Sequence, residues 1–246
     1  MLKLIVCVAL LLLAAPAYAM HISEGILPLP WAVFWYAVAL PFVALGIRQV
    51  NLMAREDLSL KPLVGLMAAV VFIISCMPVP VPTAGTCSHP CGTGMAAILV
   101  GPFVSTLIAS VALLLQALFL SHGGLSTLGA NIVSMGVAGS FAGYLTFKGL
   151  RSIRAPLAVA AFLAGILADW ATYLTTSVEL AGGIRGGDPF LPLMVKIMIA
   201  FVPTQLPLGI LEGAITAGMV VLLYNKRPDI LVRMRVIEPA EVKSNG

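Results

Sequence analysis

The residues best suited to chemistry in this 246-residue chain are its three histidines, His21, His89 and His122. A single histidine is most often an ordinary polar residue, so none of the three indicates a site by itself. Only 10% of the residues are charged, however, and the chain is poor in other ionisable side chains. Three imidazoles in separate segments of such a chain are candidate ligands for a transition metal.

The first nineteen residues have the parts of a secretory signal peptide. Lys3 provides a positive charge, residues 4–15 form an unbroken apolar run, and residues 17–19 (Ala-Tyr-Ala) have the small-x-small form of a cleavage site. The apolar run is shorter than the roughly 18–20 residues that a spanning helix needs. A retained membrane anchor is the alternative. We expect cleavage after residue 19, which leaves Met20 with a free amine outside the cytoplasm.

A free amine followed by histidine is a compact chelator. Met20 would offer its amine, and His21 its imidazole and its backbone amide once deprotonated. The small chelate rings favour a flat arrangement, which a second imidazole would complete to a square set of four nitrogens. Such sites suit Cu(II) or Ni(II), and Co(II) accepts the same ligand field, whereas Mg²⁺ and Ca²⁺ prefer oxygen. The sequence therefore predicts a transition-metal site.

The elements that must position these residues are membrane helices. Hydrophobic residues make up 60% of the chain and the mean hydropathy is +1.06, whereas soluble domains carry about 25% charged residues. Lipid is therefore the expected solvent, and an open chain in lipid satisfies its backbone only as helices. The net charge of +4 comes from short loops, not from a patch that would bind nucleic acid. The apolar segments are 28–47, 62–78, 94–120, 128–147, 155–176 and 192–224.

Basic residues between these segments predict the orientation, because such residues stay in the cytoplasm. Those assigned to cytoplasmic loops are Arg48, Arg55, Lys61, Lys148, Arg151 and Arg154, and those of the tail are Lys226, Arg227, Arg233, Arg235 and Lys243. For the chain to alternate sides, segment 94–120 must cross an even number of times, and Gly101-Pro102 is a helix-breaking pair. We therefore predict two short helices there, Thr93–Val100 and 102–120.

The predicted architecture is an all-α integral membrane protein with about seven transmembrane helices, its amino terminus outside and its carboxyl terminus inside. Residues 1–19 are the predicted cleaved signal peptide, 20–225 the transmembrane metal-binding domain and 226–246 a cytoplasmic tail. Short helices are tolerated in a membrane where protein surrounds them or where they line a cavity. The amino terminus and the segments 78–92 and 121–126 then lie on the outer side, and they contain all three histidines.

Three motifs in these outer segments resemble those of one transporter family. The opening Met-His-Ile-Ser-Glu-Gly-Ile-Leu-Pro at 20–28 is similar to the MHIxEGxLP start of the CbiM/NikM substrate-binding components of energy-coupling-factor metal transporters. Residues 86–94 (TCSHPCGTG) are similar to the family's SHPTGTG loop, and 116–131 (QALFLSHGGLSTLGAN) to its QALxLAHGGLTTLGAN stretch. The resemblance runs from residue 20 to about 224, and the SHP form looks closer to the cobalt members, CbiM.

The resemblance implies a function, ligands and partners. Co²⁺, or Ni²⁺ in the alternative, would be the transported ion and no other cofactor is implied, with Met20, His21 and His89 as metal ligands. Asn131 is a candidate to hydrogen-bond a metal-bound imidazole, and the other candidates around the ligands are Ser88, Glu24 and His122. The implied partners are a CbiQ-like transmembrane component, a CbiO-like cytoplasmic ATPase and a small CbiN-like membrane subunit, in the inner membrane of a bacterial or archaeal cell.

Two cysteines depart from the family's pattern. Cys87 and Cys91 stand where the family commonly has serine and threonine. Plain substitution of one small residue by another is one interpretation. A disulfide around His89 is a second, because cysteines outside the cytoplasm tend to oxidise, and thiolate ligation of the metal is a third.

Ionisable and amide side chains also lie inside the apolar segments, where they are expensive and often functional. Asp169, Glu212 and Gln205 are the clearest cases. The carboxyl groups could pair with serine or asparagine across helices, or they could couple the chain to a partner subunit. Small residues such as Gly136, Gly139 and Gly143 would suit either internal packing or docking.

The sequence contains no motif of an enzyme or an ATPase. It has no GxxxxGK[ST] loop for nucleotide phosphates and no HExxH zinc-protease helix, so ATP hydrolysis is expected in a separate subunit. Two other functions remain open. One is an intramembrane metalloenzyme with zinc on the three histidines and Glu24 as general base. The other is a secondary transporter in which Asp169 and Glu212 relay protons, although the sequence shows no repeated halves.

Overall fold

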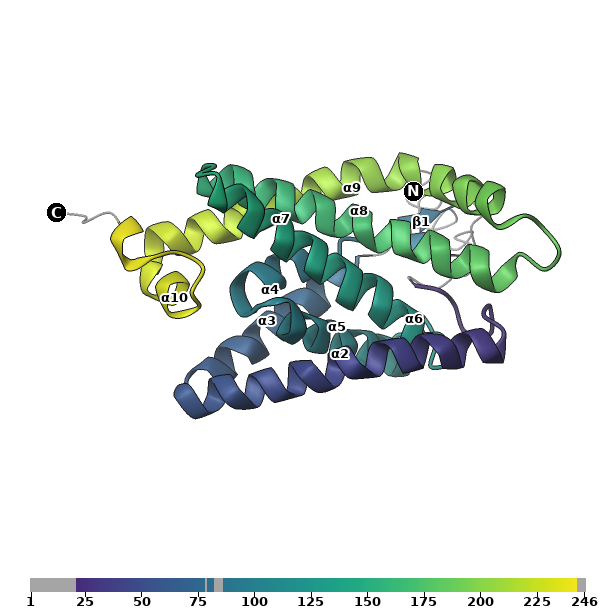
Figure 1. Ribbon diagram of the computed structural model, residues 1–246, viewed down its shortest axis with the longest axis horizontal. Helices are drawn as coiled ribbons and strands as arrows, with labels where there is room; N and C mark the ends of the chain where they lie inside the picture. Colours follow the sequence, from purple (N-terminus) through teal and green to yellow (C-terminus); the bar gives the residue numbers. More distant parts are fainter. Residues whose placement is uncertain (1–20, 78, 82–85, 243–246) are drawn as a thin grey trace, which may run out of the picture.

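The computed structural model describes residues 21–77, 79–81 and 86–242 and is almost entirely helical (Figure 1). The long elements are α2 (Leu29–Glu56), α3 (Leu60–Ser75), α5 (Pro102–Phe119), α8 (Leu157–Ile184) and α9 (Phe190–Lys226). The shorter ones are α4 (Thr93–Val100), α6 (Leu128–Asn131), a π-helix at Ile132–Gly139, α7 (Ser140–Ser152), α10 (Pro228–Arg233) and a 3₁₀ turn at Pro239–Glu241. Met20, and with it the predicted terminal amine, lies outside the described residues, as do the signal peptide and most of segment 78–85.

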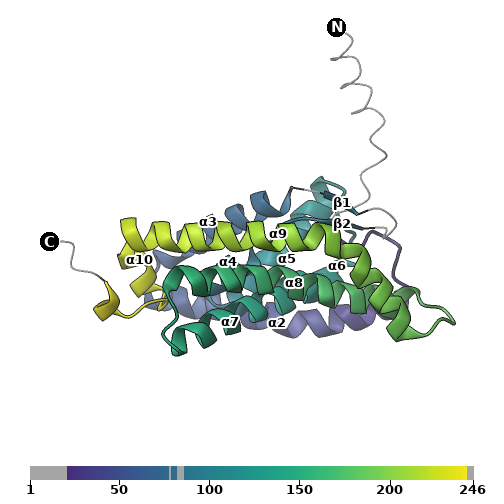
Figure 2. The same ribbon diagram turned by 90° about the horizontal axis from the view of Figure 1, so that it is seen from above.

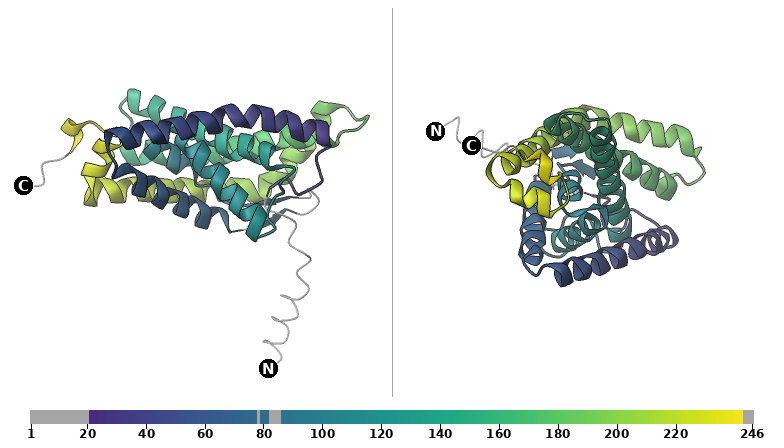
Figure 3. Two further views of the ribbon diagram at one scale, coloured as in Figure 1. Left: turned by 90° about the horizontal axis from the view of Figure 1, so that it is seen from below. Right: turned by 60° about the vertical axis from the view of Figure 1, so that its left-hand side comes forward.

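The long helices have the length and the apolar outer faces of membrane-spanning helices. Five helical stretches in the described part of the chain are long and apolar enough to cross a membrane, counting Leu128–Ser152 as one, and α3 is a shorter apolar helix. Large apolar side chains such as Leu29, Phe119 and Ile199 are exposed on their outer faces, with 74%, 76% and 63% of their surface accessible. In water such faces would be unstable. The protein is therefore a multi-pass membrane protein, and the views of Figure 3 show its long helices running roughly along one axis.

The helix α4 is the centre of the bundle. All eight of its residues are buried, and α5, α7 and α8 pack around it. Close packing depends on glycine: a methyl group on Gly94 would come within 2.6 Å of the Ala168 side chain, and one on Gly143 within 2.8 Å of the Gly94 backbone. This short helix is thus surrounded by protein, which satisfies the condition for a short intramembrane helix. The glycines at 139 and 143 serve internal packing and not docking.

The predicted break at Gly101-Pro102 is confirmed, since α4 ends at Val100 and α5 begins at Pro102. Gly101 has a φ of +86°, a backbone conformation that other residues rarely adopt. Other boundaries were predicted too short. The helix α2 continues nine residues beyond the predicted end at 47 and α8 eight beyond 176, so Arg48 and Arg55 lie on α2, not in a loop. A helix does not have to end where the hydrocarbon ends, and in α2 the added turns are polar.

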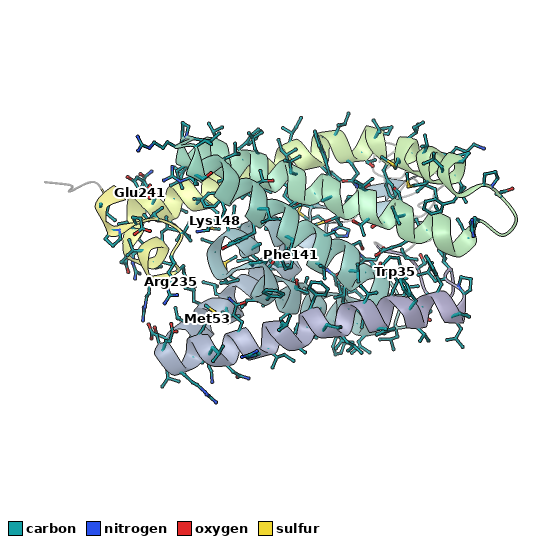
Figure 4. The ribbon with its side chains drawn as sticks, viewed as in Figure 1. Trp35, Met53, Phe141, Lys148, Arg235 and Glu241 are labelled. Carbon is teal, nitrogen blue, oxygen red and sulfur yellow. The ribbon has the colours of Figure 1, made fainter. Side chains whose placement is uncertain are left out.

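The two ends of the bundle differ in character. At one end, α10 and the segment after it fold back on the helices, where Arg151 binds Glu241 and Arg233 binds Asp57. Figure 4 shows Lys148, Arg235 and Glu241 together at this end, far from Trp35. At the other end, the two-stranded antiparallel hairpin β1 (Val79–Val81) and β2 (Thr86–Ser88) packs against α9 (Figure 2). The hairpin was not predicted, because each strand has only three residues.

Candidate metal centre

Two of the three histidines meet at the hairpin end of the molecule. His21 precedes α2, His89 lies between β2 and α4, and Nε2 of His89 is 3.3 Å from Nδ1 of His21. The ring centroids are 4.5 Å apart with an angle of 80° between the rings. Both side chains are buried, with 8% and 1% of their surface accessible. Residues 68 positions apart in the chain thus form a compact imidazole pair.

Hydrogen bonds on the far sides of the rings determine where the protons lie. Ser75 donates its hydroxyl to the Phe72 carbonyl at 3.1 Å, so it accepts the Gln116 amide N–H at 2.7 Å. The Gln116 carbonyl oxygen then faces Nε2 of His21 at 3.0 Å, and this nitrogen must donate. On the other ring, Nδ1 of His89 lies 2.9 Å from the Pro90 carbonyl oxygen and must also donate.

The two nitrogens that face each other are therefore both lone-pair nitrogens. Two acceptors at 3.3 Å repel unless a proton or a cation lies between them. Two adjacent nitrogen ligands, each about 2.0 Å from a metal, are about 2.8 Å apart in a square site. A small approach of the rings would thus complete this geometry. The Nδ1 atom of His21 is also the ring nitrogen that a small chelate ring through its own backbone amide requires.

Burial disfavours a proton as the bridging group. Desolvation, followed by the nearby His89 ring, holds the pKa of His21 well below its usual value, although the hydrogen bond to Gln116 opposes this. Neutral imidazole is the form that binds metal. Burial therefore favours the neutral, metal-binding form of His21.

The irregular segment that carries His21 is held by the turn before α6 and by α6 itself. The Ile22 amide donates to Oδ1 of Asn131 at 3.0 Å, and Thr127 donates its hydroxyl to the Ile22 carbonyl at 2.6 Å. Further along, the Ser126 amide donates to the Glu24 carboxylate at 3.0 Å, and hydrogen bonding to Ser126 lowers the pKa of Glu24. We had predicted that Asn131 would contact an imidazole. It holds the backbone next to His21 instead. Gln116 contacts the imidazole instead.

The loop that carries His89 is fixed from α8 and α9. The His89 amide donates to the Tyr173 hydroxyl at 2.9 Å. The amides of Cys91 and Gly92 donate to the two oxygens of the Glu212 carboxylate at 2.6 and 2.9 Å. Ser88 shares a hydrogen bond of 2.7 Å with Thr204. Glu212 thus binds backbone amides, so the interpretation that it pairs with serine or asparagine is wrong.

The remaining predicted residues lie close to the pair without facing it directly. His122 is half-buried in the turn after α5, its amide donates to the Gln116 carbonyl at 3.2 Å, and burial lowers its pKa. A methyl group on its neighbour Gly123 would lie 3.3 Å from the His21 side chain. Cys91 is a buried free cysteine in the structure, which argues against the disulfide interpretation. The side chain of Cys87 lies outside the described residues.

Comparison with known proteins gives a consistent result. Residues 21–230 match the family model CbiM, described as the cobalt uptake substrate-specific transmembrane region. The chain belongs to the CbiM family. It is therefore a membrane transporter component and not an enzyme, as the sequence analysis predicted.

Individual relatives and structures agree with this membership. The chain is 74% identical over 228 residues to a cobalt transport protein CbiM of Geobacter sulfurreducens, a match that covers 93% of this chain and 66% of the relative. It is 57% identical to one of Sorangium cellulosum, with 90% and 98% covered. A crystal structure of a truncated transition metal transporter aligns with a TM-score of 0.74 at 27% identity, covering 84% of this chain and 99% of the other.

Several residues of this CbiM-family site were missed as site residues by sequence reasoning. Gln116 and Thr127 stood within a quoted motif, but no role was assigned to them. Tyr173 and Glu179 were not singled out, although Glu179 is fully buried and accepts the Trp31 indole N–H at its backbone carbonyl. A polar side chain within an apolar segment was the available signal for Gln116 and Tyr173, whereas Thr127 and Glu179 lie outside the predicted segments.

Proposed function

We propose that this protein is the substrate-capture subunit of an ATP-driven energy-coupling-factor importer for Co²⁺ that supplies cobalamin biosynthesis. The observation that carries the proposal is the His21–His89 pair, in which Nδ1 of His21 and Nε2 of His89, both on buried rings, lie 3.3 Å apart. With the Met20 amine and the His21 amide they would form a square set of four nitrogens, which selects transition metals over Mg²⁺ and Ca²⁺.

The choice of cobalt rests on the family and the relatives. The family model is described as a cobalt uptake region, and the Geobacter and Sorangium relatives are named cobalt transport proteins. A nickel importer subunit is the second candidate, because the same four nitrogens suit Ni(II). Metal content would separate them: protein purified from cells given equimolar cobalt and nickel should contain mainly cobalt, and a nickel-dominated preparation would favour the second candidate.

The proposal includes an outer location for the site and separate partners for transport. Cleavage after residue 19 would generate the terminal amine, and the basic end of the bundle would face the cytoplasm, where a CbiO-like ATPase acts through a CbiQ-like membrane component. The ten basic residues between Arg48 and Arg235 that we assigned to the cytoplasm support this orientation. The described chain itself would bind the ion and depend on the partners for energy.

An uptake assay tests both parts of the proposal. Cells that express the chain with its partners should accumulate ⁵⁷Co against a gradient, and the chain alone should bind the ion without accumulating it. His89→Ala should lose most metal binding while the protein still inserts and purifies, because one of the four nitrogens is gone. His122→Ala is the matched control and should lose much less. Concentrative uptake by the chain alone, or parent affinity in His89→Ala, would contradict the proposal.

A further inference from the structure

A second group of metal-binding side chains lies on the inner side of the His89 loop. Cys91, Asp169 and Glu212 are all buried, and one ligand atom from each lies within 4.8 Å of the other two. We call these three residues the polar cluster. Cys91 comes from the loop before α4, Asp169 from the middle of α8 and Glu212 from the middle of α9. The Cys91 sulfur lies 3.9 Å from the His89 carbonyl oxygen, so the polar cluster is adjacent to the His89 backbone.

Asp169 carries a buried carboxyl group that has no hydrogen-bond partner. Its side chain is fully buried, and neither carboxyl oxygen has a hydrogen-bond partner. The neighbouring Trp170 indole donates to the Gln205 carbonyl at 3.1 Å and not to the Asp169 carboxyl group. None of the four ion pairs among the described residues includes Asp169 or Glu212. A buried carboxyl group without a partner is costly, and natural proteins rarely retain one without a function.

Glu212 and Cys91 are positioned to complete such a site. Glu212 accepts one backbone amide at each oxygen, and because a carboxylate has about four lone-pair positions, others remain for a metal. The Cys91 thiol contacts the His89 carbonyl weakly at 3.9 Å and has the Thr172 hydroxyl as a further hydrogen-bond partner. These two hydrogen bonds hold the Cys91 backbone beside Glu212, and Gly92 then leads into α4 with a left-handed φ of +70°.

We propose that the polar cluster is a second, internal site for a divalent transition-metal ion, with the Cys91 sulfur and oxygens of Asp169 and Glu212 as ligands. Sulfur and oxygen ligands at about 2.3 and 2.1 Å from a tetrahedral ion lie about 3.5 Å apart, so the cluster contracts by about 1 Å around it. A thiolate with carboxylates suits Co²⁺ or Zn²⁺ better than Mg²⁺ or Ca²⁺. Binding displaces protons from these groups to the solvent.

The charge of the ion explains why two acids are placed together inside a membrane protein. Two ionised carboxylates at this depth repel each other and are poorly solvated. With the Cys91 thiolate the three ionised ligands carry three negative charges, of which a dication offsets two; neither a water molecule nor a neutral side chain offsets any. The loop that carries His89 to the outer pair carries Cys91 to the polar cluster, so an ion that leaves the outer pair inward meets the polar cluster next.

Cobalt titration of the purified full chain tests the inference without any transport assay. The background variant carries His21→Ala and His89→Ala, which remove the outer pair, and Cys87→Ser, which removes the neighbouring thiol. Stripped of metal and titrated with Co²⁺ alone, it should bind one equivalent and develop a near-ultraviolet thiolate-to-cobalt charge-transfer band. Cys91→Ser should abolish the band. Asp169→Asn should weaken binding on the order of ten- to a hundred-fold.

Two controls keep the result interpretable. Cys76→Ser changes a cysteine outside the polar cluster and should leave the band intact. Asp169→Asn removes no hydrogen bond of the structure, so it should elute from size exclusion like its parent. The parent chain should bind two equivalents, and only one should show the thiolate band. Absence of the band from both the parent and the background variant, or its persistence in Cys91→Ser, would overturn the second site while leaving the proposed function intact.

Discussion

The His21–His89 pair and the polar cluster share one loop but are built by different means. In the pair, each outward ring nitrogen has a carbonyl acceptor, Gln116 for one ring and Pro90 for the other, and the other ring nitrogens face each other. In the polar cluster, Asp169 has no hydrogen-bond partner for either oxygen. The pair is thus preorganised by hydrogen bonds that hold its tautomers, whereas the polar cluster is held by backbone amides at one carboxylate alone. We expect the pair to bind the ion more tightly and more selectively.

The largest effect on metal binding by the pair is expected from a change at the amino terminus. One glycine inserted between Ala19 and Met20 leaves every side chain in place but moves the amine one residue away from His21. The amide of Met20 then stands where the amine was, and it resists losing its proton. Metal affinity should fall as far as in His21→Ala, and the absorption of the planar nitrogen site should disappear. The measurement is cobalt or nickel titration of the purified, correctly processed protein.

An alanine added at the far carboxyl terminus of the chain is the control for the insertion, and it should bind like the parent. Parent affinity in the glycine-extended protein would show that the terminal amine is not a ligand. The site would then have to be rebuilt from His21, His89, His122 and the loop cysteines.

A smaller effect is expected from the residue that holds the His21 tautomer. Gln116→Leu removes the acceptor for Nε2–H of His21 and leaves the Ser75 hydroxyl without its donor. The ring can then rotate or carry its proton on Nδ1, the nitrogen that faces His89. Substitutions of this kind reduce metal affinity about 10- to 100-fold. Isothermal titration with Co²⁺ would measure the loss.

Gln49→Leu, which changes a glutamine beside Gly101 far from the pair, is the matched control and should keep parent affinity. Binding by Gln116→Leu within a factor of about two of this control would show that the pair does not depend on its outer hydrogen bonds. The pair would then not differ from the polar cluster in being preorganised by hydrogen bonds.

The two sites also differ in how far the sequence could predict them. His21 and His89 lie in short motifs that resemble those of the family, so local reading predicted both as ligands, and the structure brings their rings together. Asp169 and Glu212 were recognised as unusual, but their relation to Cys91 depends on how α8 and α9 pack, which spacing does not encode. For the same reason Glu212 was assigned side-chain partners when its actual partners are two amides. The helix break at Gly101 was predictable because glycine and proline act locally, whereas the ends of α2 and α8 were not, because a helix does not have to end where the hydrocarbon ends.

The smallest expected effect is on the protonation of the apo pair. Burial and the neighbouring His89 ring lower the pKa of His21, so its ring should stay neutral at pH 6.5, where an exposed histidine is about half protonated. The unfolded chain therefore binds this proton more readily than the folded chain. It follows that the stability contributed by the neutral ring is fully present above pH of about 6.5 and is lost as the pH falls toward the lowered pKa.

Nitrogen-15 NMR of histidine-labelled apo protein would follow the ring directly, with a peptide of residues 20–25 as the unfolded reference. The peptide should titrate near pH 6.5 and the protein well below it, and addition of cobalt should remove the titration because the metal holds the position of the proton. A His21 midpoint at or above that of the peptide would mean that water or a shared proton already occupies the space between the two rings, and the pair would lose the feature that distinguishes it from the polar cluster.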